Sequence, residues 1–419
     1  MIDAAALDEL RAVAGEAAVL EHDPMGFDGA RLELTIAPTS VEDLAATLGV
    51  CASRRLPLLV RGGGSRLGLG NRPRGARAWL STAALEPVCE VDGDEGVARV
   101  GAATPAADLD AAARGAGWRS PFETSNPLST VGGVLATAAS GPRSLGLGPA
   151  RRAALGLEVA LASGDRTRCG SRVVKNVTGY DLVKLYVGSL GTLGVLTEAW
   201  LRLRPKPEAE RAFAGRVGHE GLALAREAAR RSGARAVAIV DGTLASAISE
   251  EGEGDLLIVE FAGDEPVVDE AEAWLRTRAG ELAEAPDAVG RLHGLQESPS
   301  TAALRFRISA PTPHLEAAHS MLRERGAGVI THPGLSQTLA FFDLESADTT
   351  GVDAAWRAVH AAVDPTVGAH AILEQAPGWA KDGRDVFDAP AATLPLMRTL
   401  KSEFDPAGVL NPGRFVGAL

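Results

Sequence analysis

LLVRGGGSRLGLG, residues 58–70, runs a short apolar segment directly into three consecutive glycines, with Arg61 before them and Ser65 after them. Glycine tolerates positive φ and lets a ligand approach backbone N–H groups, so this turn after a predicted strand is a natural cradle for a phosphate group. A plain tight loop is the alternative that the stretch by itself leaves open.

The two commonest nucleotide-binding fingerprints do not fit this stretch. A P-loop needs a lysine and a hydroxyl residue after its last glycine, but Gly68 is followed by Leu69 and Gly70. A dinucleotide fingerprint G-x-G-x-x-G that starts at Gly62 meets Leu67 where its third glycine should stand. The sequence therefore disfavours both a kinase or NTPase and a Rossmann domain.

The charge balance of the chain argues against nucleic acid or an anionic membrane surface as a partner. The 419 residues carry 42 basic and 54 acidic side chains, a formal net charge of −12, and no block of like charges. Three widely spaced cysteines, Cys51, Cys89 and Cys169, form no C-x-x-C pair. This spacing argues against a disulfide framework, a zinc site and an iron–sulfur cluster within the chain.

No sign of a targeting or membrane-spanning segment is found in the sequence. The N-terminus, MIDAAALDELRAVAGEAAVL, lacks a basic region before its apolar residues. No stretch reaches the roughly 18 apolar residues of a membrane helix. We expect a cytoplasmic protein without a direct membrane span.

Helical and extended patterns alternate through the first part of the chain. Thr39 is predicted to cap a helix, and a strand follows at residues 56–60. Residues 97–103 predict another strand, after which Thr104 would cap a helix with Pro105 in its first turn.

A second glycine-rich helix start lies in NPLSTVGGVLATAASGPRS, where Thr130 is the predicted cap and Gly132 and Gly133 fall in the first turn. Small residues continue to Gly141, so few side chains shield the backbone. Exposed N–H groups at the positive end of a helix favour an anion. Close packing against another element explains the same small residues, and the two interpretations are equally supported at this point.

From about residue 208 the pattern changes to strands and helices that predict a second α+β domain with antiparallel pairing. A last helix carries Met397, Leu400 and Phe404. The chain closes with DPAGVLNPGRFVGAL, in which Pro412 and Gly413 form a predicted turn.

Five segments, in this order, resemble the FAD-linked oxidase superfamily of the vanillyl-alcohol-oxidase type. They are RGGGS at 61–65, STVGGVLATAASG at 129–141, VVKNVTGYDL at 173–182, GSLGTLGVLT at 188–197 and FDPAGVLNPGRF at 404–415. Within the superfamily, the amino-acid sequences of the third and fourth segments are most similar to those of the FAD-binding subunit of glycolate oxidase. Residues 207–390 are matched only in their general layout.

The resemblance implies an α+β fold made of a PCMH-type FAD-binding domain with two subdomains, followed by an α+β cap domain with an antiparallel sheet. The expected bounds are residues 28–206 for the FAD-binding domain, 207–390 for the cap and 391–419 for a C-terminal segment that returns to the FAD domain. The residues expected to hold FAD are Arg61, Gly62, Gly63, Gly64, Ser65, Thr130, Gly132, Gly133, Ser140, Gly141, Gly194, Val195 and Asn411.

Several departures from the superfamily's pattern carry information. Some relatives attach FAD through a histidine in the first glycine loop, but GGGSRLG contains neither histidine nor cysteine, so we predict non-covalent FAD. Leu190 stands where D-lactate and D-2-hydroxyglutarate dehydrogenases often have a glutamate. Their substrate-metal motif, H-x-G-D-G-N-x-H, is absent, and we predict no metal site.

The eight histidines are dispersed, and each is interpreted first as a surface or packed residue. Two, His332 and His370, lie near predicted strands and are candidates for a general base, although no catalytic residue is assigned. Arg305 and Arg307 are candidates for a carboxylate clamp. Their alternation in LRFRIS is taken to turn only one of them inward.

The predicted function is that of a flavin redox subunit that oxidises a small 2-hydroxy acid, glycolate or D-lactate. The flavin performs the chemistry and the protein positions the substrate. The resemblance implies two partners, a second FAD-binding subunit and an iron–sulfur subunit, through which the protein would reach a membrane. Two alternatives remain, an FAD-binding electron-relay or assembly subunit without its own substrate site, and a free-standing FAD-linked dehydrogenase.

Overall fold

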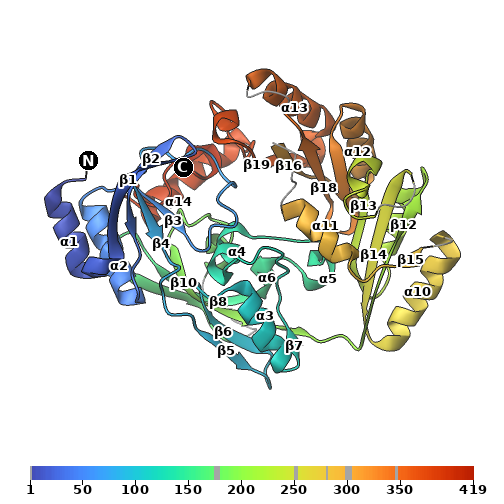
Figure 1. Cartoon of the computed structure of the whole chain (residues 1–419), viewed down its shortest axis with the longest axis horizontal. Helices are drawn as coiled ribbons and strands as arrows, with labels where there is room; N and C mark the ends of the chain where they lie inside the picture. The colour runs from blue at the N-terminus through green and yellow to red at the C-terminus, as the bar shows by residue number, and fades with distance from the viewer. Residues whose placement is uncertain (1, 174–179, 250–252, 280–281, 298–303, 345–347) are drawn as a thin grey trace.

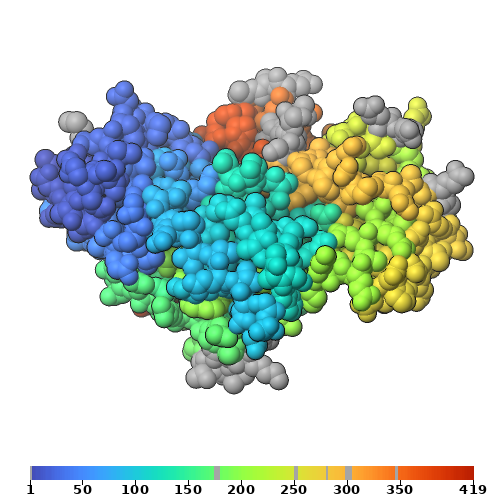
Figure 2. Space-filling model, turned by 60° about the horizontal axis from the view of Figure 1, so that its bottom comes forward, coloured from blue at the N-terminus to red at the C-terminus, as the bar shows by residue number. Residues whose placement is uncertain are grey.

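A β-sheet subdomain at the N-terminus, a second sheet subdomain and a large cap follow one another along a computed structural model of the chain (Figure 1). The structure describes residues 2–173, 180–249, 253–279, 282–297, 304–344 and 348–419. Most of the VVKNVTGYDL motif, at 174–179, lies outside these residues. In Figure 2 the N-terminal subdomain and the cap lie at opposite ends of the molecule, with the second subdomain between them.

The first subdomain is a four-stranded sheet in the order β1-β2-β4-β3. Strands β1 and β2 are antiparallel, and β2 and β3 both run parallel to β4. Ser40, not the predicted Thr39, caps helix α2, because the Ser40 hydroxyl accepts the Asp43 N–H at 3.0 Å. The elements are α1 (Ala4–Ala14), β1 (Val19–Phe27), β2 (Ala30–Ile36), α2 (Val41–Ser53), β3 (Leu58–Arg61) and β4 (Ala78–Ser81).

The second subdomain is a five-stranded antiparallel sheet in the order β5-β6-β10-β8-β9. The predicted cap Thr104 does not cap the next helix, since its hydroxyl donates to the carbonyl of Val88, and Pro105 occupies the cap position. The elements are β5 (Cys89–Asp92), β6 (Val97–Gly101), α3 (Ala106–Gly115), α4 (Val131–Thr137), α5 (Ser144–Leu147), α6 (Ala150–Ala153), β8 (Ala154–Ala160), β9 (Arg166–Gly170), α7 (Val183–Tyr186) and β10 (Val195–Arg202). Strands β7 (Trp118–Arg119) and β11 (Arg204–Pro205) pair beside this sheet.

The cap is built on an eight-stranded antiparallel sheet in the order β15-β12-β14-β13-β17-β18-β16-β19. Its strands are β12 (Ala209–Val217), β13 (Ala234–Val240), β14 (Asp255–Gly263), β15 (Ala283–Glu284), β16 (Leu304–Ser309), β17 (Gly328–His332), β18 (Gln337–Phe342) and β19 (His370–Gln375). Its helices are α8 (Gly221–Ala228), α9 (Gly242–Ala245), α10 (Glu265–Ala279), α11 (Ala288–Glu297), α12 (Leu315–Glu324) and α13 (Thr349–Ala362).

Alternation along the cap strands gives its sheet two different faces. On β16, Leu304, Phe306 and Ile308 pack with α12 and α13 in one core cluster. On β17, Ile330 packs in another cluster, with α11. The polar residues between these apolar positions therefore gather on the α11 face, which is turned toward the FAD-binding subdomains.

The C-terminal segment returns to the first sheet, as Figure 1 shows for α14 (Leu394–Phe404). Leu58 of β3 donates its N–H to Val409 and accepts that of Asn411. The ring of Phe404 meets that of Tyr186 edge to face at 5.7 Å. No helix among the described residues is long and apolar enough to span a membrane.

Candidate functional site

A cavity of about 880 Å³, including space open to solvent, lies where the two sheet subdomains meet the C-terminal segment. That volume falls within the range of small-molecule and cofactor pockets. Ten of the thirteen residues predicted to hold FAD line it: Arg61, Gly62, Gly63, Gly64, Ser65, Thr130, Gly132, Gly133, Val195 and Asn411. Among the described lining residues there is neither a histidine nor a cysteine.

The first glycine loop presents unused backbone donors to this cavity. The N–H groups of residues 63–65 donate to no protein acceptor in the described part of the chain. Gly64 has φ +83°, and a Cβ on Gly63 would lie 1.7 Å from the Leu128 carbonyl oxygen. The loop therefore fits the pyrophosphate of FAD. Glycine at position 63 also lets the loop pack against the backbone at Leu128, just before the second glycine segment.

In the second glycine segment, the backbone N–H groups of Gly132 and Gly133 bind protein acceptors and are not left free for an anion. Thr130 caps α4 as predicted and accepts the Gly133 N–H at 3.2 Å. The Gly132 N–H donates to the Ala102 carbonyl, and a Cβ on Gly132 would lie 2.7 Å from the Ala102 Cβ. Close packing thus accounts for Gly132, and the expectation that both glycines expose free N–H groups is wrong.

The remaining three predicted contacts lie elsewhere. Ser140 and Gly141 line a second pocket beside the first. Gly194 lines neither pocket, because it packs on β8, where a Cβ would come within 2.5 Å of Val159. Leu190 lines the cavity and has φ +54°, and its carbonyl accepts the side-chain amide of Asn411 at 2.7 Å.

Two buried cations hold the first glycine loop in shape, and the sequence interpretation missed both. The Arg414 guanidinium donates to the carbonyls of Leu67 and Leu69, and to that of Asn71 at 2.8 Å. The Lys381 ammonium donates to the Gly68 carbonyl at 2.7 Å. Burial lowers the pKa of each cation below its usual value. The sequence signal for Arg414 is its place in the PGRF turn of the fifth resembling segment, FDPAGVLNPGRF.

The second pocket shares Arg66, Leu69 and Thr137 with the FAD cavity and is roofed by the polar face of the cap sheet. Of the sequence candidates, Arg305, Arg307 and His332 line it. His370 is exposed on β19 and lines neither of these two pockets. The sequence interpretation missed six polar lining residues: Arg66, Thr137, Gln296, Glu297, Gln337 and Glu374.

Arg305 and Arg307 both face the second pocket, so the expectation that only one turns inward is wrong. Residues i and i+2 of a strand lie on the same face. Both contact one carboxylate: the Nε of Arg307 donates to Glu374 Oε1 at 2.6 Å, and the Nε of Arg305 lies 3.4 Å from Glu374 Oε2. Burial raises the pKa of Glu374, but the charges of Arg307 and Arg305 outweigh it, and the pKa stays below its ordinary value.

His332 is buried in the same pocket wall as a neutral imidazole. Its Nδ1 lies 3.2 Å from the carbonyl oxygen of Val237, an acceptor, so Nδ1 carries the proton. Its Nε2 is left as an acceptor and faces the side-chain amide of Gln296. Burial lowers the pKa of His332 to about 4. The ring is therefore a proton acceptor at neutral pH.

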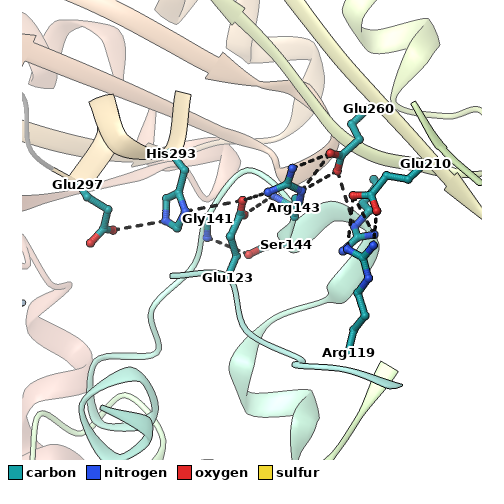
Figure 3. A network of polar contacts seen from close by, with 10 residues as sticks. Arg119, Glu123, Gly141, Arg143, Ser144, Glu210, Glu260, His293 and Glu297 are labelled. Carbon is teal, nitrogen blue, oxygen red and sulfur yellow. Dashed lines mark hydrogen bonds and ion pairs between the residues drawn. The ribbon is translucent and has the colours of Figure 1, made fainter. Parts of the chain in front are cut away.

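A network of buried and partly exposed ion pairs joins the cap to the FAD-binding subdomains beside this pocket (Figure 3). Arg143, from the segment after Gly141, donates from Nη2 to Glu260 of β14 at 2.7 Å and from Nη1 to Glu123 at 2.9 Å. Two arginines of the FAD domain pair with two glutamates of the cap: Arg119 with Glu210, and Arg143 with Glu260. These pairs fix the segment that lines the second pocket against the cap.

Glu123, His293 and Glu297 form one end of this network (Figure 3), and Glu297 also lines the second pocket. Burial raises the pKa of Glu123 to about 7 and lowers that of His293 to about 3. The Nδ1 of His293 lies 3.6 Å from Glu123, and its Nε2 lies 3.8 Å from Glu297.

The described residues contain no cluster of histidine, cysteine and acidic side chains that could hold a metal ion. His332, Pro333 and Gly334 keep the H-x-G start of the metal motif named above, but Leu339 stands where its second histidine would fall. His332 and Leu339 both line the second pocket. That H-x-G spacing is the sequence signal that points to this pocket.

Two family models match the chain. The model described as "FAD binding domain" matches residues 32–170, and the model described as "FAD linked oxidases, C-terminal domain" matches residues 388–415. The second match covers most of the segment that carries Asn411 and Arg414.

The chain matches three curated relatives, and in each case the match spans less than half of the relative's length. Glycolate oxidase subunit GlcD of Bacillus subtilis (strain 168) is 36% identical over 180 residues, 43% of this chain and 38% of the relative. A D-lactate dehydrogenase of Archaeoglobus fulgidus is 38% identical over 173 residues, 41% of this chain and 39% of the relative. Glycolate oxidase subunit GlcE of Escherichia coli (strain K12) is 35% identical over 159 residues, 38% of this chain and 45% of the relative.

Solved structures resemble the chain over nearly its whole length. A p-cresol methylhydroxylase with bound substrate superimposes with a TM-score of 0.73 at 15% identity and covers 98% of this chain and 96% of that one. The 4-ethylphenol oxidase from Gulosibacter chungangensis gives 0.75 at 17% identity, again over 98% and 96%. These likenesses confirm the predicted fold class, an α+β PCMH-type FAD-binding domain with an antiparallel cap.

Proposed function

From the premise that the chain belongs to the FAD-linked oxidase superfamily, with FAD as its cofactor, we propose that it is a subunit that oxidises a small 2-hydroxy acid and passes the electrons to a partner. The substrate is glycolate or D-lactate. The observation that carries the proposal is the second pocket, where two arginines and a neutral histidine converge beside the FAD cavity. The names of the curated relatives support the substrate class.

The polar groups of the second pocket suit the two functional groups of a 2-hydroxy acid. The guanidinium of Arg307 is placed to bind the carboxylate, the interaction for which a planar fork of donors is suited. The Nε2 of His332 would accept the hydroxyl proton after Gln296 releases it. Bound FAD supplies the acceptor for the hydride from the α-carbon, which leaves a 2-oxo acid.

The onward transfer of electrons belongs to a partner in this proposal. The chain has only three cysteines, and their spacing builds no iron–sulfur cluster. The relatives named as glycolate oxidase subunits support a place in a complex. A second FAD-binding subunit and an iron–sulfur subunit are the partners that we propose.

An anaerobic absorbance spectrum tests the proposal. We expect the flavin band of the purified chain to bleach when glycolate or D-lactate is added, and acid precipitation to release the flavin into solution. Bleaching by neither acid, with the flavin still bound, would refute a substrate site within the chain. Flavin that stays with the precipitate would refute non-covalent binding.

One observation favours the alternative of an electron-relay subunit. Glu374 contacts both arginines and the Gln296 amide faces the acceptor nitrogen of His332, so side chains of the chain itself already engage the groups assigned to the substrate. A chain that holds FAD, bleaches with no hydroxy acid and supports turnover only with its partners would establish that function.

A further inference from the structure

We propose that Glu374 sets the charge of the substrate in the second pocket and restricts it to anions with a single carboxylate. This inference rests on the proposed function, because it takes the second pocket as the substrate site. It adds the selection between mono- and dicarboxylates.

A β-bulge places Glu374 between the two arginines. Strand β19 pairs Arg305 with Gln375 and Phe306 with Leu373, so Glu374 is an extra residue without a partner in the register. Bulges re-aim side chains and are frequent beside active sites. Its side chain is 15% exposed, against 10% for Arg305 and 26% for Arg307. The carboxylate therefore lies in the pocket wall and not in solvent.

The titratable groups of the second pocket leave one positive charge uncompensated. Three guanidinium groups, those of Arg66, Arg305 and Arg307, face two carboxylates, those of Glu297 and Glu374, and His332 is neutral. Arg66 is paired with Glu297. The two remaining arginines share Glu374, so the charge balance suits one bound carboxylate.

The free hydrogen-bond donors agree with this charge balance. Arg305 donates from Nη1 to the Gln296 carbonyl, and Arg307 donates to Glu374 only from Nε. In the described part of the chain, no protein acceptor uses the terminal nitrogens of Arg307. These two nitrogens form a fork for one carboxylate. A second carboxylate in the pocket would meet the negative charge of Glu374, since like charges disfavour a wrong partner.

The test compares propionate and malonate, which have the same chain length and differ by one carboxylate. Binding to the FAD-loaded chain is followed by the change in the flavin absorbance spectrum, which needs no turnover. We expect the wild type to bind propionate more tightly than malonate. Glu374→Gln should shift the ratio of the two dissociation constants toward malonate by at least about tenfold, because a nearby like charge is removed.

A charge-preserving variant and the wild type itself complete the test. Glu374→Asp should keep the wild-type order of affinities. Malonate binding as tightly as propionate in the wild type, or an unchanged ratio in Glu374→Gln, would overturn the inference while leaving the proposed function in place. No spectral response to either anion in the wild type would overturn both.

Discussion

Burial of the His332 side chain determines its protonation state and therefore its chemistry. Its side chain hydrogen-bonds on both nitrogens and lies 3% exposed in the wall of the second pocket. Water is excluded, so the neutral ring is favoured and the pKa falls to about 4. The same side chain on a surface would be half-protonated near pH 6.5.

We predict that His332→Gln slows the bleaching of bound flavin by a 2-hydroxy acid by about 10²- to 10⁴-fold, the usual contribution of a general base. The flavin itself should stay bound, because His332 lies outside the FAD cavity. Stopped-flow absorbance under anaerobic conditions measures the rate. His370→Gln, at an exposed position, is the matched control, and an equal loss there would contradict the assignment.

His332 also predicts a pH dependence of stability. Its folded pKa, about 4, is below the unfolded value of about 6.5, so the unfolded state binds more protons between these values and stability falls as pH drops through this window. The loss approaches about 3 kcal/mol near pH 4. Denaturant titrations at pH 4.5 and 7 should show a smaller pH effect in His332→Gln. An equal pH effect in both proteins would refute the prediction.

Packing against neighbouring backbone helps to set the shape of the first glycine loop. A Cβ on Gly63 would collide with the backbone of the second loop, 1.7 Å from the Leu128 oxygen. The same Cβ on Gly68 would meet only the Gln375 side chain, at 4.0 Å. Packing therefore requires glycine at position 63 and places no such requirement on position 68.

We predict that Gly63→Ala displaces the first glycine loop and lowers the FAD content of the purified protein by at least tenfold at a fixed FAD concentration. Gly68→Ala should retain FAD, because its methyl group has room. The ratio of absorbance at the flavin band to that of the protein measures both. Normal flavin content in Gly63→Ala would contradict the role given to this loop.

The Arg414 guanidinium ties the same loop to the C-terminal segment. We predict that Arg414→Met weakens FAD binding and destabilises the chain, because three buried or part-buried carbonyls lose this donor and Asp28, of its two ion-pair partners in the described chain, keeps only Lys381. The expected cost is about 3–5 kcal/mol for an unpaired buried group of this kind. Flavin fluorescence on dilution and urea unfolding measure the two effects. Wild-type behaviour in both assays would rule out the clamp.

At the scale of the whole molecule, the ion-pair network of Figure 3 joins the cap to the FAD-binding subdomains. Glu260 is 1% exposed and depends on Arg143 for its hydrogen bonds. We predict that Arg143→Met costs about 3–5 kcal/mol, because it leaves a buried carboxylate poorly paired. Arg278→Met removes an exposed pair with Glu227 and should cost less than about 1 kcal/mol. Equal losses in denaturant unfolding would refute a docking role for the network.

The sequence predicted what depends on local chemistry. The strand before the first glycine loop, the Thr130 cap and the five ordered motifs all pointed to the FAD fold that the comparisons confirm. The position of His332 in a polar pocket wall was not predictable in this way. Its partners Gln296 and Val237 come from distant elements, so only the cap's sheet topology brings them together.

The arginine pair was misjudged for a different reason. Spacing of two in a strand sets a common face, and the sequence already contained that information. The bulge at Glu374 and the donors of Gly132 are different, because they depend on pairing between segments far apart in the chain. Such pairings leave no mark on the local pattern.

The contact between Arg414 and the first glycine loop also determines when, during synthesis, the cofactor cavity can be completed. Arg414 and Leu69 are 345 residues apart. At about 5–20 residues per second, the loop leaves the ribosome tens of seconds before its clamp does. During that interval the nascent chain has no complete cofactor cavity. Stable capture of FAD is therefore a late step, completed after the cap has been translated.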